Sequence, residues 1–201
     1  MKPFEDYFVE NDDATRILHA FSALSEMEET DEPKFIFAHL LVKPTSYLFY
    51  DYRHKPEIIA KLVKNISTAE LKEFYIKQII VINREVELLI DNLLTEYSTK
   101  PVIILQADHG PALTFSEPDK LQQENLTDSM LKERMRIFNA YYLPLNGNDI
   151  LYDSITPVNT FRLILNFYFD SNYKLLKDQS YYSTKERPYK FIDVTKRVQS
   201  D

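Results

Sequence analysis

The chain has 201 residues, a formal net charge of −7 at pH 7 and a hydrophobic fraction of 44%. This length and composition predict one soluble globular domain over residues 1–201. The negative net charge argues against nucleic acid as the main partner, since phosphate binding needs clustered Lys and Arg. The absence of cysteine excludes disulfides, thiolate metal sites and cysteine nucleophiles.

The sequence shows no membrane-directed segment. Its first six residues are acidic and lack the apolar core of a signal peptide. The most apolar helical stretch, Ile79–Leu94, is interrupted by charged residues and is too short to cross a bilayer. We therefore expect the chain, as given, to be soluble.

Two helices and a strand are predicted in the first half. The helix over 12–27 places apolar residues on one face, and the helix over 68–97 repeats apolar residues at steps of three and four. Between them, the apolar run Lys34–Val42 predicts a buried strand with His39 near its carboxyl end, followed by an irregular loop over Tyr47–His54.

The second half alternates strands and helices. The run Val102–Leu105 is rich in β-branched residues and entered through Pro101, which predicts a buried parallel strand. The elements expected after it are a polar loop (Pro111–Asn125), a short helix (Thr127–Met135), a strand ended by Pro144 (Ile137–Leu143), a helix opened by Thr156-Pro157 and running to Phe169, and an edge strand within Tyr189–Val194. This order predicts an α/β fold with a mainly parallel sheet flanked by helices.

The tetrad Ala107-Asp108-His109-Gly110 is the strongest candidate for chemistry. It follows the Val102–Leu105 strand and contains one of only two glycines. Ligands bind outside the carboxyl ends of strands in open α/β sheets, and a carboxylate with an imidazole suits Zn or Mn. Adjacent strand residues face opposite ways, so both can bind one ion only where the chain turns, which Gly110 permits. The alternative is structural, with Asp108 as a cap and His109 packed against the sheet.

Other candidate residues carry weaker signals. His39 lies at a predicted strand end, although a lone histidine in an apolar segment is more often a hydrogen-bonded core residue. His19 and His54 receive no role. The sequence contains no G-x-S-x-G elbow, P-loop or H-E-x-x-H helix, so no catalytic nucleophile is assigned.

Four ordered segments resemble a known family. They are PKFIFAHLL (Pro33–Leu41), PVIILQADHG (Pro101–Gly110), RIFNAYYLP (Arg136–Pro144) and LYDSITPVNTFRLILNFYF (Leu151–Phe169). Together they resemble the C-terminal half of sulfatase-like proteins of the alkaline phosphatase superfamily, most closely the membrane-anchored bacterial relatives of lipoteichoic acid synthases and phosphoethanolamine transferases. The likeness extends from about Asp12 to Val194.

The resemblance implies a partial alkaline phosphatase-like fold and a divalent metal, with Zn or Mn favoured and Ca possible. In that superfamily the Asp-His after a buried strand ligates metal, which corresponds to Asp108 and His109. His39 matches a recurrent histidine and is expected, more weakly, in a substrate pocket. Full-length relatives are membrane-anchored, with this domain extracytoplasmic.

Departures from the family pattern imply an incomplete metal site. Relatives carry an acidic ligand and a Thr, Ser or modified Cys nucleophile in an earlier segment, before the region that this chain resembles. A second histidine usually follows the first by five residues, where this chain has Pro44, and no histidine occurs in Pro111–Gln123. Two protein ligands bind a divalent ion weakly, since zinc usually takes three or four.

Three functional hypotheses follow. The first is a fragment of a metal-dependent phosphate or sulfate ester hydrolase or phosphotransferase that is weak or inactive as this isolated chain. The second is a degenerate, non-catalytic binding or assembly module that retains the fold. The third is an enzyme completed by another chain, either a missing N-terminal half or a second copy in a homo-oligomer. The sequence does not distinguish sulfate from phosphate chemistry.

Overall fold

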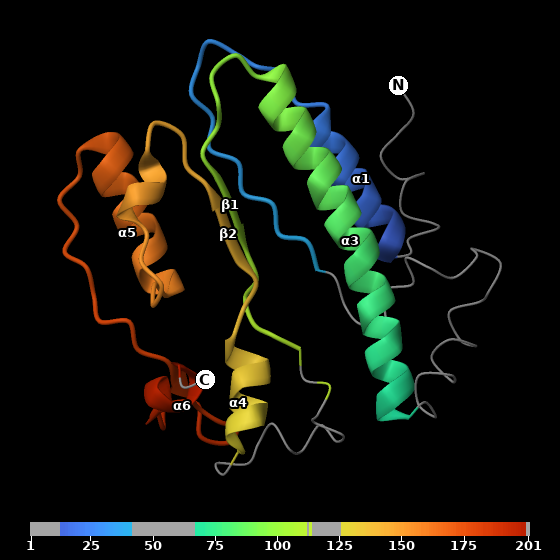
Figure 1. Ribbon diagram of the computed structural model, residues 1–201, viewed down its shortest axis with the longest axis vertical. Coiled ribbons are helices and arrows are strands. Elements are labelled where there is room, and N and C mark those ends of the chain that lie inside the picture. The colour runs from blue at the N-terminus through green and yellow to red at the C-terminus, as the bar shows by residue number, and fades with distance from the viewer. Residues whose placement is uncertain (1–12, 42–66, 112, 114–125, 200–201) are drawn as a thin grey trace. The chain divides into compact units, whose positions relative to one another are not determined.

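The computed structural model describes residues 13–41, 67–111, 113 and 126–199 (Figure 1). The chain falls into two compact units, one ending at Lys100 and the other beginning at Pro101. The predicted loop over Tyr47–His54 lies outside the described residues, as does nearly all of the predicted polar loop after Pro111. No helix in the described ranges is long and apolar enough to cross a membrane.

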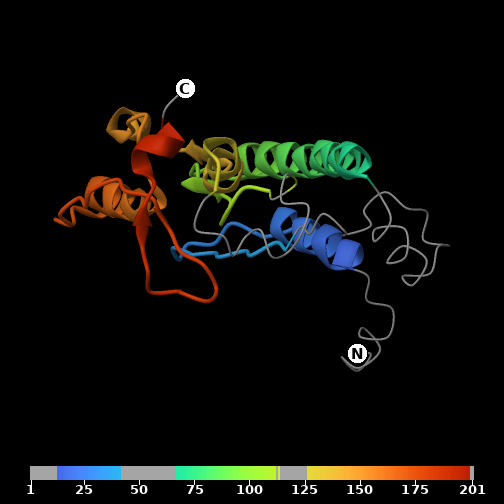
Figure 2. The same ribbon diagram turned by 90° about the horizontal axis from the view of Figure 1, so that it is seen from below.

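The first unit is built on two helices, α1 (Asp13–Ser25) and α3 (Thr68–Glu96), as the apolar periodicity predicts. They lie side by side in both ribbon views (Figures 1 and 2). Their shared core consists of Ile17, Phe21 and Leu89, with partly buried apolar residues around it. Burial of each such side chain contributes roughly 1.5 to 3 kcal/mol, so this seam is the main source of stability for the pair.

A capping box starts α3. The Ser67 side chain accepts from the Glu70 amide at 3.3 Å, and the Glu70 carboxylate accepts from the Ser67 amide at 2.7 Å. These reciprocal bonds satisfy two backbone donors that a helix end otherwise leaves without a partner. The hydrogen bonds from Ser67 also hold the pKa of Glu70 below its usual value.

The connector after α1 is attached to the end of α3. Tyr97 Oη donates to Met27 O at 2.7 Å, and the Glu29 carboxylate accepts from the amides of Ser98 and Thr99 at 2.9 and 3.1 Å. These backbone hydrogen bonds, first from Ser98 and then from Thr99, lower the pKa of Glu29. These contacts join the segment after α1 to the segment after α3.

The buried strand predicted over Lys34–Val42 is wrong for its described part. Residues 34–41 form no strand, and the side chains of Phe35 and Phe37 are each 79% exposed. Of residues 34–41, Leu40 packs against the α1–α3 core. An apolar run becomes a strand only when a neighbouring strand pairs with its backbone, and the described part of this unit provides helices instead.

In the second unit, β1 (Ile103–Gln106) pairs antiparallel with β2 (Asn139–Tyr142). Ile103 lies opposite Tyr142, and Gln106 opposite Asn139. Both predicted strands are therefore confirmed. The expected parallel pairing of β1 is wrong for its pairing with β2, which is antiparallel. The apolar residues of β1 are half-buried, where we expected a buried strand. The run of β-branched residues indicates a strand without specifying the direction of its partner. The described residues are thus mixed α/β with small antiparallel sheets.

A second small sheet joins α4 and α6 around one core. The helix α4 (Asp128–Met135) begins after Thr127, as the sequence predicts, and the Thr127 side chain accepts from the Met130 amide. The predicted edge strand is confirmed as β4 (Ile192–Asp193), which pairs antiparallel with β3 (Tyr181–Tyr182) and leads into α6 (Thr195–Gln199). The buried side chains of this core are Leu126, Leu131, Tyr182, Val194 and Val198.

The remaining helix, α5 (Pro157–Phe169), follows the short 3-10 helix η3 (Gly147–Ile150) and begins at the predicted Pro157. Its first turn is held by Asp178, whose carboxylate accepts from the amide and hydroxyl of Thr156 at 2.8 and 2.7 Å. Tyr152 Oη donates to the same carboxylate at 2.6 Å. A distant side chain thus completes a helix start that Thr156 does not cap by itself.

Candidate functional site

The candidate site is the turn that follows β1, formed by Asp108, His109 and Gly110. The amide of Ala107 donates to Phe138 O at 2.9 Å, which extends the β1–β2 ladder by one bond before the chain turns. Asp108 and His109 therefore stand just past the end of the strand, where the sequence places them.

Gly110 sets the turn by packing against the end of α4. Its amide donates to Arg134 O at 2.8 Å. A Cβ at this position would lie 2.0 Å from Glu133 O and 3.1 Å from Arg136 O. The φ angle of Gly110 is not positive, so the position needs glycine for the close backbone approach and not for a left-handed conformation.

Beyond the glycine, the chain stays attached to the same helix. The backbone amide of Leu113 donates to the carboxylate Oε1 of Glu133. With the Gly110 amide bonded to Arg134 O, two points on either side of Pro111 are tied to α4. The turn is therefore held by hydrogen bonds to α4.

The side chains of Asp108 and His109 face each other across this turn. His109 Nε2 lies 3.5 Å from Asp108 Oδ2, while the other carboxylate oxygen accepts from the His109 amide at 2.9 Å. Both side chains reach solvent, with 69% of the aspartate and 49% of the histidine exposed. An oxygen and a nitrogen donor are thus adjacent and accessible.

Arg134, in the last turn of α4, places its guanidinium group beside this pair. Its Nη1 lies 2.6 Å from His109 Nδ1 and donates to Gly110 O at 2.9 Å. Burial lowers the pKa of Arg134, and the opposing attraction of Asp108 is smaller. Sequence reasoning missed this residue. A basic residue in the last turn of a helix is expected for any helix, and nothing local relates it to a tetrad 25 positions earlier.

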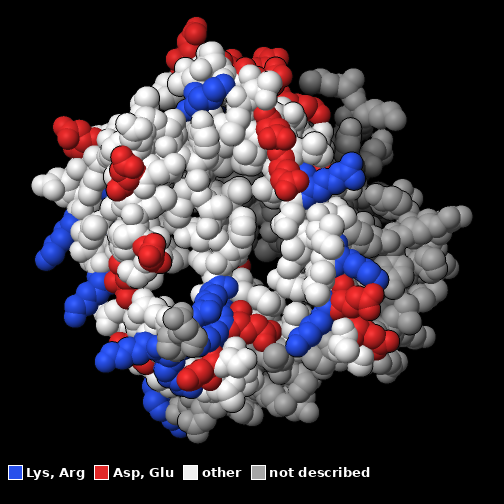
Figure 3. Space-filling view, in the orientation of Figure 1, with Lys and Arg blue, Asp and Glu red and all other residues white. Residues whose placement is uncertain are grey.

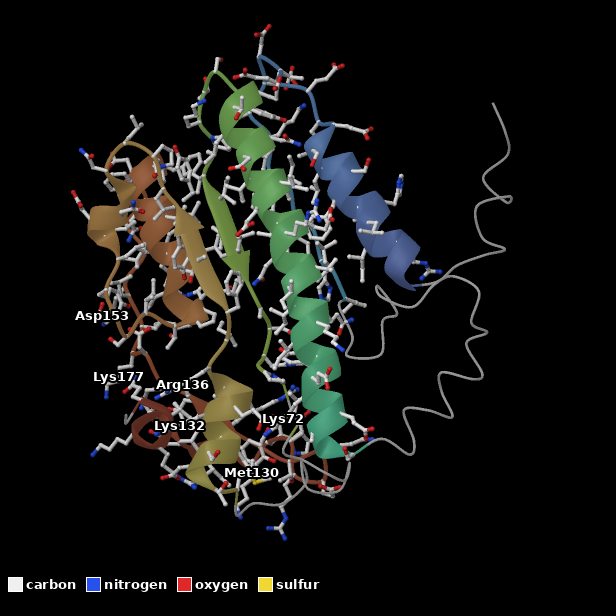
Figure 4. The ribbon with its side chains drawn as sticks, turned by 45° about the vertical axis from the view of Figure 1, so that its right-hand side comes forward. Lys72, Met130, Lys132, Arg136, Asp153 and Lys177 are labelled. Carbon is white, nitrogen blue, oxygen red and sulfur yellow. The ribbon has the colours of Figure 1, made fainter. Side chains whose placement is uncertain are left out.

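Neighbouring basic residues of α4 point elsewhere. Figure 4 shows Lys132 and Arg136 on the side of the helix that faces α6, where Arg136 Nε donates to Val198 O at 3.0 Å. Arg134 lies between them in sequence and reaches the tetrad instead. On the face drawn in Figure 3, Lys and Arg side chains are interspersed with Asp and Glu among the described residues.

The Asp108–His109 pair has the spacing of two ligands on one cation. Metal bonds of roughly 2.0 to 2.2 Å at a tetrahedral angle place two ligand atoms about 3.3 to 3.6 Å apart. The observed distance between Nε2 and Oδ2 is 3.5 Å. Within the described ranges, no group of three or more His, Cys, Asp or Glu side chains is placed to hold a metal ion. The described corner thus offers two protein ligands.

The other described histidines, His19 and His39, belong to the first unit. His39 is exposed in the first unit, with its ring centroid 6.4 Å from that of Phe37, so it is not the hydrogen-bonded core residue that was the alternative. His19 is exposed on α1. His54 and Pro44 lie outside the described residues. The expected substrate-pocket role of His39 stays a prediction.

Comparisons of the chain with protein-family models, curated proteins and solved structures gave no match.

Proposed function

We propose that this chain is the C-terminal portion of a sulfatase-like domain, in which Asp108 and His109 hold a divalent cation for hydrolysis or transfer of a phosphate or sulfate ester. The observation that carries the proposal is the 3.5 Å spacing of His109 Nε2 and Asp108 Oδ2 directly after β1. This spacing suits two ligands of one ion, at the strand end where open α/β sheets bind ligands.

The proposal includes a partial alkaline phosphatase-like fold with a mainly parallel sheet. Parallel sheets often carry an antiparallel strand at one edge. β2 fits such an edge strand, because it pairs antiparallel with β1 and is its one neighbour in the described sheet. The second edge of β1 would then receive a parallel strand.

The donor set favours Zn or Mn, because an imidazole accompanies the carboxylate, while Ca stays possible. A bound cation supplies Lewis-acid polarisation of the ester and activation of an attacking hydroxyl. The chain contributes the Asp108 carboxylate and the His109 Nε2 lone pair. Gly110 O, 3.0 Å from His109 Nδ1, can accept a hydrogen bond from the N–H that a metal-bound histidine carries on its other nitrogen.

With two ligands, the cation is held weakly, and we expect the isolated chain to be catalytically weak or inactive. An N-terminal half of such a domain or a second copy of the chain would supply further ligands and the nucleophile. The alternative is a non-catalytic binding or assembly module that retains the fold. Pro44, which stands where relatives carry a second histidine, favours that alternative.

Titration calorimetry with Mn²⁺ and Zn²⁺ tests the ligand assignment. We expect weak binding that is lost in both Asp108→Ala and His109→Ala. His19→Ala is the matched control, since His19 is an exposed histidine on α1 in the other unit. Binding that survives both tetrad substitutions would refute the site.

A turnover assay separates the enzymatic proposal from the alternative. Aryl phosphate and aryl sulfate are incubated with the chain and Mn²⁺, with and without the added N-terminal half of a sulfatase-like domain. Turnover that appears only with the added half supports the fragment hypothesis. No turnover in either mixture, with cation binding intact, supports the non-catalytic module. Robust metal-dependent turnover by a confirmed monomer would contradict the expected inactivity.

A further inference from the structure

Three atoms meet on the side of His109 that faces away from Asp108. Arg134 Nη1 lies 2.6 Å from His109 Nδ1, the same Nη1 donates to Gly110 O at 2.9 Å, and His109 Nδ1 lies 3.0 Å from Gly110 O. Each pair is within hydrogen-bond distance. The three contacts, however, place conflicting demands on one ring nitrogen.

A guanidinium nitrogen only donates hydrogen bonds, and a backbone carbonyl only accepts them. Arg134 therefore bonds Nδ1 only when this nitrogen carries no proton, whereas Gly110 O bonds it only when it does. In a neutral imidazole the first case puts the ring proton on Nε2, the nitrogen 3.5 Å from Asp108 Oδ2. The second case leaves a lone pair on Nε2.

Only the second arrangement can ligate a cation between His109 and Asp108. Ligation by Nε2 needs its lone pair, and the ring proton then sits on Nδ1 and points to Gly110 O. An Arg134 N–H aimed at a protonated Nδ1 at 2.6 Å would set two donors against each other. The cation can therefore bind only after Arg134 leaves the ring.

We propose that Arg134 competes with the divalent cation for His109 and, once displaced, binds a tetrahedral oxyanion beside the cation. The inference rests on the proposed function and assigns Arg134 as an oxyanion-binding residue of that site. A guanidinium is suited to phosphate and sulfate oxygens because its donors form a planar fork. Arg134 is already held close to the Asp108–His109 pair by its bond to Gly110 O.

This arrangement couples the two ligands. Cation binding costs the Arg134–His109 hydrogen bond, and an oxyanion that captures the displaced guanidinium recovers part of that loss. By linkage, the oxyanion must then raise the affinity for the cation by the same factor as the cation raises the affinity for the oxyanion. An ester substrate and its metal would thus bind in a mutually dependent way.

The first test reads the tautomer of His109 without any metal. Two-bond ¹H–¹⁵N spectra of the metal-free full chain, recorded over a series of pH values, show which ring nitrogen is protonated. We expect the proton on Nε2 in the wild type and in Lys132→Met, and a shift toward Nδ1 in Arg134→Met. A wild-type proton on Nδ1 would overturn the proposal.

The second test measures Mn²⁺ affinity by calorimetry, with and without sulfate. Arg134→Met should bind Mn²⁺ about tenfold more tightly than the wild type, the effect expected for one hydrogen bond to a charged group. Sulfate should tighten Mn²⁺ binding to the wild type and to Arg134→Lys, but not to Arg134→Met. Lys132→Met is the control for loss of one positive charge from the same helix.

The outcomes separate this inference from the proposed function. Binding of Mn²⁺ that survives Asp108→Ala, or no binding at all, refutes the proposed function and the competition with it. Binding that Asp108→Ala abolishes but Arg134→Met leaves unchanged refutes the role of Arg134 alone. Equal sulfate effects in the wild type and in Arg134→Met would refute the oxyanion step.

Discussion

Replacement of Gly110 by alanine tests whether the tetrad depends on close packing against α4. The added Cβ would lie 2.0 Å from Glu133 O, a backbone atom that cannot rotate away, and 3.1 Å from Arg136 O. Relief of this clash requires the turn and the end of α4 to separate by more than an ångström. The hydrogen bond from the Gly110 amide to Arg134 O, now 2.8 Å, would then break.

The cost follows from these two losses. Overpacking of a tight site destabilises by about 1 to 3 kcal/mol, and a lost backbone hydrogen bond adds about 1 kcal/mol. Alanine also restricts the unfolded chain, which offsets about 0.4 to 1 kcal/mol. We expect Gly110→Ala to lower the free energy of unfolding of the second unit by about 1 to 3.5 kcal/mol.

Native-state hydrogen exchange of the α4 amides measures this loss in the unit concerned, and urea denaturation followed by circular dichroism provides the global value. Gly147→Ala is the comparison variant at the other buried glycine. There the Cβ would meet Tyr168 Oη at 2.2 Å and Leu143 Cβ at 2.8 Å, which are side-chain atoms and not the backbone of α4. A loss below about 0.5 kcal/mol for Gly110→Ala would refute the reasoning, since it is smaller than a single hydrogen bond.

Three further substitutions probe the two cores and the Asp178 carboxylate. Leu131 is 1% exposed, so Leu131→Ala should lower the free energy of unfolding of the second unit by about 2 to 5 kcal/mol. Phe21 is 4% exposed, so Phe21→Ala should lower that of the first unit by about 3 to 5 kcal/mol. Hydrogen exchange should detect each loss in the unit that carries the substitution. Asp178→Ala should cost about 2 to 3 kcal/mol at neutral pH in urea denaturation, because Tyr152 and Thr156 lose the carboxylate that accepts their hydrogen bonds. The fully buried Asn159 keeps Leu176 O as an acceptor. Burial opposes ionisation of Asp178, but the hydrogen bonds from Tyr152 and Thr156 outweigh it and lower its pKa. The ionised Asp178 carboxylate therefore adds its full contribution to stability above the ordinary aspartate pKa of about 4, and this contribution is lost as the pH falls through the lower pKa of the folded state. The wild type should lose stability on acidification more steeply than Asp178→Ala. Equal slopes of stability against pH would contradict this.

Local signals predicted most helices of the fold. Thr156-Pro157 marks the start of α5 because proline suits the first helical position. The helix expected from Thr127 agrees with α4, whereas the hydroxyl cap of Thr127 is a finding of the structure. Apolar periodicity likewise located α1 and α3 to within a few residues. Such signals act over one or two turns, so they are readable without tertiary structure.

Strand pairing was less predictable. The apolar runs at Lys34–Val42 and Val102–Leu105 look alike in sequence, yet only the second forms a strand in the described structure, and it pairs antiparallel with β2. A strand needs a partner from elsewhere in the chain, and neither the identity of that partner nor its direction is encoded in the run itself.

The candidate site divides in the same way. The sequence by itself determined that Asp108 and His109 stand together past a strand end and that Gly110 follows them, because these are neighbours in the chain. Only the tertiary structure decided that Gly110 packs against the backbone of Glu133 and that Arg134 reaches His109 Nδ1. The reason is physical: the docking of α4 against the turn depends on packing and backbone hydrogen bonds between segments more than 20 residues apart, which no local pattern records.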